Sequence, residues 1–308
     1  MASPDGGAGH GLDARFAVAF ATGFFTEYCG LSQFARDTAA ELQHHRCFPC
    51  VVCEKAFPIL TQDSSRNLGY PTSAAALAEQ ALEWARPLDH ANTLAYTLTT
   101  GVCLTNICAR QPRRVAQAAE EAALHAEKYS LAVFRVWTKI DLAWARIHLA
   151  LQSDCDEFEA GLYAKERTGT GRFQPWQWSL AAELRLLVGQ PQEANSCISR
   201  AFELLEAGDD VAFSSEIYRQ RAQVLLQLNA ANYDAAVADL LSSLEIAKKQ
   251  EALSWQLRAA RDLARLWGEA GDRRRAVDLL APIHSRFSEG FETADLKESG
   301  ILLSELAN

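Results

Sequence analysis

A short turn, a polar first helical turn and an alanine follow one another in residues 188–194 (VGQPQEA), 229–236 (NAANYDAA) and 269–276 (EAGDRRRA). The closing alanine of each stretch lies 42 and then 40 residues after the previous one. Glycine, proline and asparagine end a helix, and the residues that follow them start the next one. The spacing therefore predicts a structural unit of about 40 residues that repeats along the chain.

The segments between these turns are rich in alanine, leucine and glutamate, which are good helix formers. Apolar residues recur in them at steps of three and four, the period of one helix face. No sustained alternation of β-branched residues occurs, so we predict an all-α protein. The predicted helices cover 13–25, 31–46, 73–88, 91–109, 113–129, 131–151, 173–188, 192–207, 212–228, 233–249, 252–269, 273–287 and a short final helix at 296–306.

Small residues at matching positions indicate how these helices pack. Ala182 and Ala264 are each flanked by large side chains in the helix that precedes a repeated turn, and an alanine follows each turn. Two facing small residues let antiparallel helices approach closely, as in the hairpins of a tetratricopeptide repeat (TPR), whose usual period of 34 residues is stretched here. An irregular helical bundle is the alternative interpretation.

The predicted organisation is one right-handed TPR-like solenoid over residues 13–308. Residues 1–12 are small, polar and glycine-rich, and form a flexible tail in this prediction. Each hairpin of such an array buries its apolar face only against its neighbours, so we expect an elongated single domain. The final helix has a polar outer face, as a capping helix needs. Residues 13–70 are the part that the pattern defines least.

The C-terminal part resembles a known family. Residues 254–267 (SWQLRAARDLARLW), 279–284 (LLAPIH) and 287–297 (FSEGFETADLK) are similar to the C-terminal TPR region of large bacterial proteins that join a class III adenylate/guanylate cyclase domain, a P-loop ATPase module and helical repeats. Residues 68–71 (LGYP) and 93–96 (TLAY) resemble earlier repeats of that region. The segment 254–308 is the most specific part of the resemblance.

The resemblance implies the regulatory repeat part of such proteins without either catalytic part. A cyclase domain needs metal-binding carboxylates on strands, and the sequence predicts no strands. A P-loop needs a glycine-rich turn that ends in Gly-Lys-Ser/Thr, and the nearest run, residues 168–172 (TGTGR), lacks the lysine. We therefore interpret 168–172 as a loop between helices. The sequence predicts no catalytic residues and no cofactor.

The composition limits the classes of partner that the protein is expected to bind. The 308 residues carry 30 Lys+Arg against 39 Asp+Glu, a net charge of −9. This acidic balance disfavours nucleic acid and anionic membranes as general partners. The longest apolar run, residues 16–25, is about half of what a membrane span needs, and no basic segment precedes it. Eight cysteines are too sparse for a disulfide framework, so we expect a cytoplasmic protein.

The densest group of possible metal ligands lies at residues 44–53. His44, Cys47, Cys50 and Cys53 could supply four ligands to zinc or several to an iron–sulfur cluster. No second cysteine pair follows nearby, however, and free cysteines are commonly small buried apolar residues. We therefore predict no metal site, with these four residues as the candidates if one exists. The same buried role is predicted for the other five cysteines. A core or groove-wall role is predicted for Trp137, Trp144, Trp176, Trp178, Trp255 and Trp267.

The predicted partner-binding residues are the arginines near the C-terminus. They comprise Arg258, Arg261, Arg265, Arg273, Arg274 and Arg275. Helical spacing places the first three on one face, where they could bind an acidic peptide or partner domain. The alternative is a solvated helix face on which Asp262 and Glu269 pair with Arg258 and Arg265.

The function predicted from the sequence is a non-enzymatic interaction module that binds a protein segment or an effector. The alternative is the sensor portion of an adenylate cyclase or ATPase system that acts on a separate catalytic subunit, or a remnant of a longer protein. The expected partner is a protein or peptide, and in the alternative a cyclase or P-loop ATPase.

Overall fold

The computed structural model describes residues 69–167, 173–208 and 212–307. These residues form helices joined by short turns, and no strand occurs among them, which confirms the predicted all-α class. The predictions for the tail at 1–12, the helices at 13–25 and 31–46 and the loop at 168–172 lie outside the described residues. None of the described helices is long and apolar enough to cross a lipid bilayer.

The helix bounds follow the sequence pattern closely. Three helices, α4, α7 and α11, begin on a proline, whose missing N–H and fixed φ suit the first helical position. The elements are α4 (Pro71–Ala85), η3 (Arg86–Leu88), α5 (Ala91–Tyr96), η4 (Thr97–Cys103), α6 (Leu104–Cys108), α7 (Pro112–Lys128), α8 (Ala132–His148), α9 (Asp156–Arg167), α10 (Gln174–Leu187), α11 (Pro191–Ala207), α12 (Ser214–Leu228), η5 (Ala230–Asn232), α13 (Tyr233–Lys249), α14 (Leu253–Glu269), α15 (Arg273–His284) and α16 (Ala294–Ala307).

One helix, α9, was not among those predicted. It is rich in charge, and Gly161 in its middle lowers its intrinsic helix propensity. The same glycine explains the packing, because a Cβ at this position would lie 2.7 Å from Cγ1 of Ile140 on α8. Gly161 thus lets α9 approach α8 closely, and the buried side chains of Phe158 and Leu162 complete the contact.

The alanines of the 40-residue repeat lie in the core. Ala194, Ala236 and Ala276 are fully buried, and so are Ala182 and Ala264 on the preceding helices. The helix pairs α10–α11, α12–α13 and α14–α15 are among the most closely packed neighbours, and α12 also packs against α10 and α14. The buried alanines explain this, since a small side chain allows two helix axes to come close together.

Six of the turns between helices share one backbone conformation. In each, the residue two positions after the helix has a left-handed φ, and two backbone hydrogen bonds close the turn on the last helical residues, the arrangement of a Schellman motif. At the end of α8, Ala150 N–H donates to the Ile147 carbonyl and Leu151 N–H to the Arg146 carbonyl, both at 2.9 Å. The left-handed residues are Arg110, Ser130, Ala150, Gly189, Glu251 and Gly271.

Glycine at two of these positions is expected to stabilise the protein. Ala150 and Glu251 are exposed, and each holds φ at 55°. A Cβ is unfavourable in this conformation, so Ala150→Gly and Glu251→Gly should each raise the free energy of unfolding by about 0.5–1 kcal/mol, measured by urea denaturation. The matched control is Lys139→Gly in the middle of α8, which should lower the same free energy by about 1 kcal/mol. A loss of stability with Ala150→Gly would contradict the prediction.

A π-helical segment, η4, interrupts the predicted helix at 91–109. Its wider turns free carbonyl groups from regular i to i+4 pairing, and such segments are frequent at functional sites. Polar side chains bond to carbonyl oxygens within or next to it: the Thr97, Thr99 and Thr105 hydroxyls donate over 2.6–2.9 Å, and the Asn106 amide donates over 2.8 Å. Threonines in this otherwise apolar stretch therefore stabilise a wide turn that remains fully buried.

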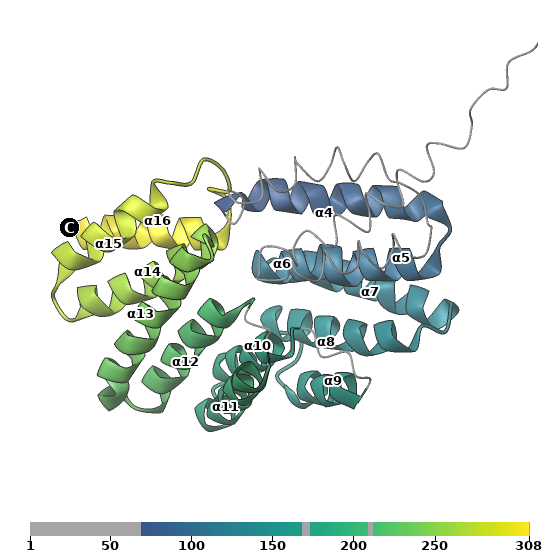
Figure 1. Cartoon of the computed structure of the whole chain (residues 1–308), viewed down its shortest axis with the longest axis horizontal. Coiled ribbons are helices and arrows are strands. Elements are labelled where there is room, and N and C mark those ends of the chain that lie inside the picture. Colours follow the sequence, from purple (N-terminus) through teal and green to yellow (C-terminus); the bar gives the residue numbers. More distant parts are fainter. Residues whose placement is uncertain (1–68, 168–172, 209–211, 308) are drawn as a thin grey trace, which may run out of the picture.

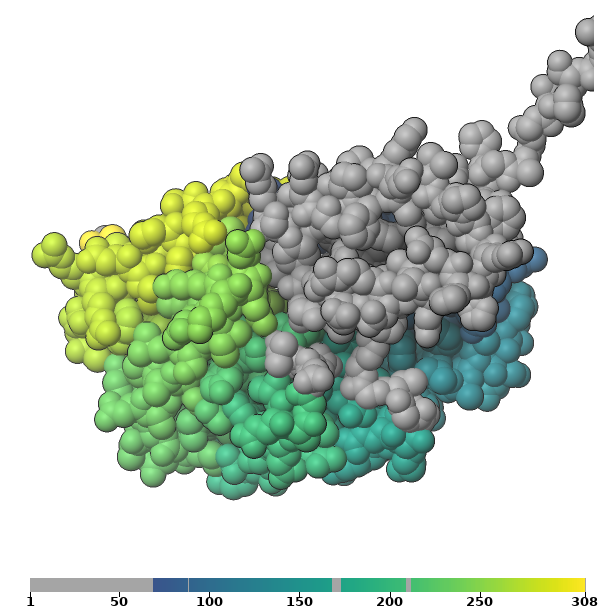
Figure 2. All heavy atoms as spheres, viewed as in Figure 1, coloured from purple at the N-terminus to yellow at the C-terminus, as the bar shows by residue number. Residues whose placement is uncertain are grey.

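The start of α4 meets the turn between α15 and α16 (Figure 1). Ser73 at the start of α4 donates its N–H and its hydroxyl to the carboxylate of Glu289, over 2.8 and 2.7 Å. Pro71 lies so close to Gly290 that a Cβ on Gly290 would collide with it. Where no grey atoms cover them, the described helices form a continuous surface in the space-filling view, from teal through green to yellow (Figure 2). The expectation that each hairpin contacts only its neighbours is therefore wrong, because the helices from α4 to α16 close on themselves.

Candidate binding site

Two of the six predicted partner-binding arginines lie inside the protein. The Arg258 and Arg261 residues on α14 are only 6% and 5% exposed. Arg258 is 2.7 Å from Asp295 and 3.0 Å from Glu216, and it also donates to the Cys108 carbonyl. The expectation of an exposed basic face that includes these two arginines is wrong, because α14 packs between α12 and α16. The alternative prediction, a solvated helix face, is also wrong for Arg258 and Arg261, because this packing buries both side chains.

These arginines belong to an ion-pair cluster that joins α12, α14 and α16 to the turn after α6, with Arg110 and Glu298 at its half-buried edge. Arg219 contacts Glu216 at 2.9 Å and Asp262 at 3.0 Å. Arg261 contacts Glu298 at 2.7 Å, and Arg110 contacts the same carboxylate at 3.1 Å. The cluster balances four arginines with four carboxylates and comprises Arg110, Arg219, Arg258, Arg261, Glu216, Asp262, Asp295 and Glu298.

Asp295 is the carboxylate that joins the C-terminal helix to this cluster. Burial raises its pKa, but the charges of Arg258, Arg261 and Arg110 outweigh burial and lower the pKa to about 2. Glu216 is buried between Arg219 and Arg258, which likewise lower its pKa against the effect of burial. Both carboxylates are therefore ionised at neutral pH, and their charges compensate those of the arginines inside the fold.

The other four predicted arginines remain on the surface. Arg265, Arg273, Arg274 and Arg275 are exposed. The Arg275 guanidinium lies over the Trp267 ring at 3.8 Å from its centroid, and Arg274 is 3.9 Å from Asp278. Partner binding by these four exposed arginines stays a prediction.

The predicted metal candidates, His44, Cys47, Cys50 and Cys53, lie outside the described residues. Within the described ranges, no three His, Cys, Asp or Glu side chains gather as a metal site would require. Cys103, Cys155 and Cys197 are buried thiols, which confirms their predicted role, and burial raises the pKa of each.

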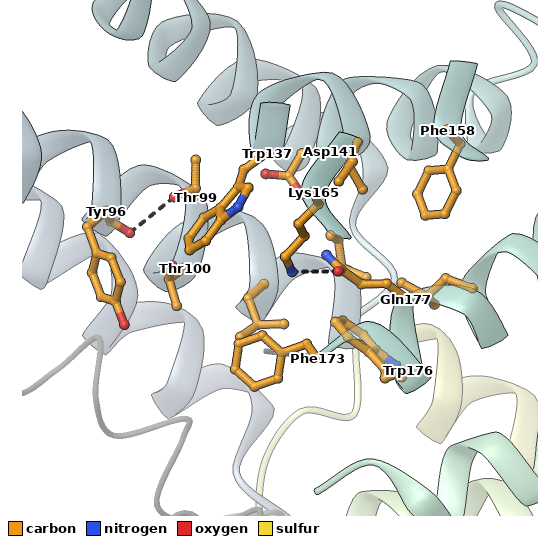
Figure 3. Close-up of a pocket in the computed structure, with 14 residues that line it drawn as sticks. Tyr96, Thr99, Thr100, Trp137, Asp141, Phe158, Lys165, Phe173, Trp176 and Gln177 are labelled. Carbon is orange, nitrogen blue, oxygen red and sulfur yellow. Dashed lines mark hydrogen bonds between the residues drawn. The ribbon is translucent and has the colours of Figure 1, made fainter. Parts of the chain in front are cut away.

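Five tryptophans are core residues, as predicted, and a sixth borders a cavity. Trp144, Trp176, Trp178, Trp255 and Trp267 are at most 6% exposed. Trp137 on α8 is half-buried and lines a cavity of about 50 Å³ between η4, α8, α9 and α10 (Figure 3). The cavity is lined by Tyr96, Thr99, Thr100, Leu104 and Ile107 from the α5–η4–α6 segment, Trp137, Ile140 and Asp141 from α8, Phe158 and Lys165 from α9, and Phe173, Trp176, Gln177 and Leu180 at and within α10.

Charged and polar groups interrupt the aromatic wall of this cavity. Lys165, 2% exposed, donates from Nζ to the Gln177 Oε1 atom at 2.6 Å, as Figure 3 shows. The same Nζ lies 5.3 Å from the centroid of the Trp137 ring. Within the described structure, the Trp137 Nε1 atom is buried and has no hydrogen-bond acceptor. A buried donor without a partner is costly, so this atom marks a place where an acceptor would bind favourably.

Asp141 is the acidic group of the cavity. Burial raises its pKa from the usual 3.8 to about 7, although a hydrogen bond with the Cys103 thiol and the charge of Lys165 act in the opposite direction. The carboxyl group therefore gains and loses its proton near neutral pH. Cys103 itself is fully buried, and burial together with Asp141 raises its pKa well above the usual value.

The sequence reasoning missed Asp141, Lys165 and the η4 threonines. A signal for Asp141 was present, because it lies four residues after Trp137 and three before Trp144, on an otherwise apolar face of α8. A charged residue in such a stripe is rarely buried without a partner. Lys165 gave no comparable signal, since its burial depends on how α9 packs against α8.

Comparison with known proteins does not assign this chain to a family: no protein-family model matches it, and no curated protein matches its sequence.

Proposed function

We propose that this protein is a TPR-like helical-repeat module that binds a partner segment or a small effector in the cytoplasm and does not catalyse a reaction. The observation that carries the proposal is the cavity between η4, α8, α9 and α10. It combines aromatic walls with a few buried polar groups, the composition typical of ligand sites.

The packing supports the TPR-like assignment. Alanines at a spacing of about 40 residues are buried where consecutive helices meet, and alternate helices such as α10 and α12 also pack together. This combination of contacts is expected when helical hairpins stack on one another.

The chemistry of the cavity supports binding over covalent catalysis. The attacking form of a cysteine is the thiolate, which a nearby cation or a helix N-terminus stabilises. Cys103 has the opposite surroundings, since burial and the neighbouring Asp141 raise its pKa. Its thiol is thus held protonated beside Asp141 and contributes packing.

Capture from a lysate of the source organism tests the proposal. The immobilised chain should enrich a partner, and Trp137→Ala should reduce the amount captured by more than about tenfold, because aromatic anchors in pockets carry most of the energy of an interface. The readout is quantitative mass spectrometry. The double variant Arg273→Glu/Arg274→Glu tests the exposed arginines in the same way.

Leu124→Ala is the matched control, because Leu124 is 75% exposed on α7 and is not among the described residues that line the cavity. Circular dichroism should show that every variant keeps its helix content. Equal capture by the wild type, Trp137→Ala and the double arginine variant would contradict the proposal.

The second candidate function is the sensor portion of an adenylate cyclase or ATPase system that acts on a separate catalytic subunit. The resemblance of residues 254–297 to the repeat region of such proteins raises this candidate. A cyclase or P-loop ATPase among the captured proteins would support it.

A further inference from the structure

A seam closes the helix array where the segment from α4 to the turn after α6 meets the segment from α14 to α16 (Figure 1). The contacts that the structure describes across this seam are mostly polar. They join Ser73 to Glu289, Arg110 to Asp295 and Glu298, and the Cys108 carbonyl to Arg258. Where such contacts face water, they contribute little net stability, because water competes for the same groups.

Two of the contacts across the seam do face water. Ser73 is exposed, and the side chains of Arg110 and Glu298 are 36% and 39% exposed. Salt weakens the attraction between exposed charges, and the screening length falls from about 10 Å at 0.1 M salt to about 3 Å at 1 M. The ion pairs that Arg110 forms across the seam should therefore weaken as the ionic strength rises.

Packing along the rest of the array has a different character. Consecutive helices such as α12 and α13 pack closely over buried alanines, and an apolar contact contains no charge for salt to screen. Across the seam, no pair of described helices packs as closely. A cavity of about 70 Å³ lies there, with Pro71 and Thr105 on one side and Trp255 and Leu296 on the other. Unfilled space forfeits dispersion contacts, so the seam is weaker than the contact between consecutive helices.

The charges at the seam give Arg110 a defined role. The members of the ion-pair cluster on α12, α14 and α16 are three arginines and four carboxylates, which together carry a net charge of −1. Arg110, in the turn after α6, is the fourth cation and brings the net charge of the cluster to zero. Closure of the seam thus compensates a negative charge on the C-terminal side, and opening restores it.

We propose that the seam is a salt-sensitive latch: the ion pairs of Arg110 hold it closed at low ionic strength, and screening of these pairs lets it open while the helices from α7 to α13 stay folded. Local opening of this kind needs less free energy than global unfolding, because it breaks few apolar contacts. It would uncover the apolar side chains of Trp255 and Leu296 at the seam cavity. The inference concerns the shape of the array and does not depend on the cavity at Trp137.

Hydrogen–deuterium exchange of the full chain, read by mass spectrometry, tests the latch. Between 0.1 M and 1 M sodium chloride, exchange should accelerate by about fivefold or more in peptides from residues 71–80 and 285–298, the two sides of the seam. Peptides from residues 174–207, in α10 and α11, should keep their exchange rates. An unstructured peptide added to each sample corrects for the effect of salt on the chemical exchange rate.

Substitutions of Arg110 separate its charge from the fold. Arg110→Gly removes the charge without strain, because Arg110 holds φ at 55°, a backbone conformation that suits glycine. At 0.1 M salt this variant should match the wild type at 1 M, and added salt should change it no further. Arg110→Lys keeps the charge and should stay closed at 0.1 M salt. Ser130→Gly is the matched control, since Ser130 holds φ at 57° in the equivalent turn after α7, and it should match the wild type at both salt concentrations.

A substitution on the opposite side of the seam provides an independent test. Glu289→Ala removes the exposed contact with the N–H and the hydroxyl of Ser73. Exchange in residues 71–80 and 285–298 should accelerate in this variant already at 0.1 M salt. Because Arg110 is still present, added salt should accelerate it further.

Unchanged exchange on both sides of the seam, in 1 M salt and in Arg110→Gly, would overturn the inference and show that packing holds the seam closed. Equal acceleration in all peptides, including those from residues 174–207, would overturn it as well, because Arg110 would then support the whole fold. Acceleration in Arg110→Gly without any response of the wild type to salt would also overturn it, since the latch would not be salt-sensitive.

Discussion

Asp295→Asn is expected to lower the free energy of unfolding by about 3–5 kcal/mol. The substitution keeps the shape of the side chain but removes a buried negative charge that contacts Arg258 at 2.7 Å and Arg261 at 3.2 Å. Removal of one partner of a buried ion pair leaves the other charge uncompensated, and losses of this size follow. Urea denaturation at pH 7, followed by circular dichroism, measures the change.

The pH dependence of this effect has a defined sign. The pKa of Asp295 is lowered in the folded state to about 2, so its contribution is present above the pKa of the unfolded chain, near 4, and is lost as the pH falls through about 2. The stability difference between wild type and variant should therefore shrink in acid. Glu292→Gln is the control: Glu292 is exposed and forms a surface ion pair with Lys297, so this change should leave stability nearly unaltered. An equal loss in both variants would contradict a special role for the cluster.

Asp141→Asn is expected to become more stabilising as the pH rises. In the wild type, burial raises the pKa of Asp141 from 3.8 to about 7, so the folded state binds a proton that the unfolded chain has released. Stability is then highest below the unfolded pKa and is lost as the pH rises from about 4 to about 7. A shift of about three pH units corresponds to about 4 kcal/mol. The asparagine of the variant does not titrate. The free energy of unfolding of the variant, relative to wild type, should therefore rise by that amount between pH 4 and pH 8.

Equilibrium denaturation at several pH values measures this difference. The matched control is Asp278→Asn on α15, where the side chain is 71% exposed and should give a difference that does not change with pH. A stability difference for Asp141→Asn that stays flat from pH 4 to pH 8 would show that this carboxyl group is ionised throughout.

The sequence predicted those features that depend on neighbouring residues along the chain. Helix bounds such as Tyr233–Lys249 matched because helix propensity and apolar periodicity act within one helix. The burial of Ala194, Ala236 and Ala276 matched because each helix packs on the next one in sequence. These features depend on residues that are close along the chain, so they can be predicted from a single sequence.

Features that join distant segments escaped prediction. Arg258 and Arg261 have the spacing of an exposed helix face, and only the approach of Glu216 and Asp295, about 40 residues away on either side, explains why they are buried. The cavity depends in the same way on α9 packing against α8, which brings Lys165 to the wall that Trp137 forms. The apolar pattern of one helix does not indicate which distant helix will pack against it.

The closure of the helix array has a consequence for folding. An open repeat array can gain or lose units at its ends, because its stability is a sum of local terms. Here Ser73 bonds to Glu289 across 216 residues of sequence, and Arg258 reaches the carbonyl of Cys108 across 150. Such contacts raise the contact order and delay part of the stabilisation until the chain is almost completely folded. The described helices thus form one cooperative unit, in which loss of the turn at Glu289 and Gly290 would remove a support of α4.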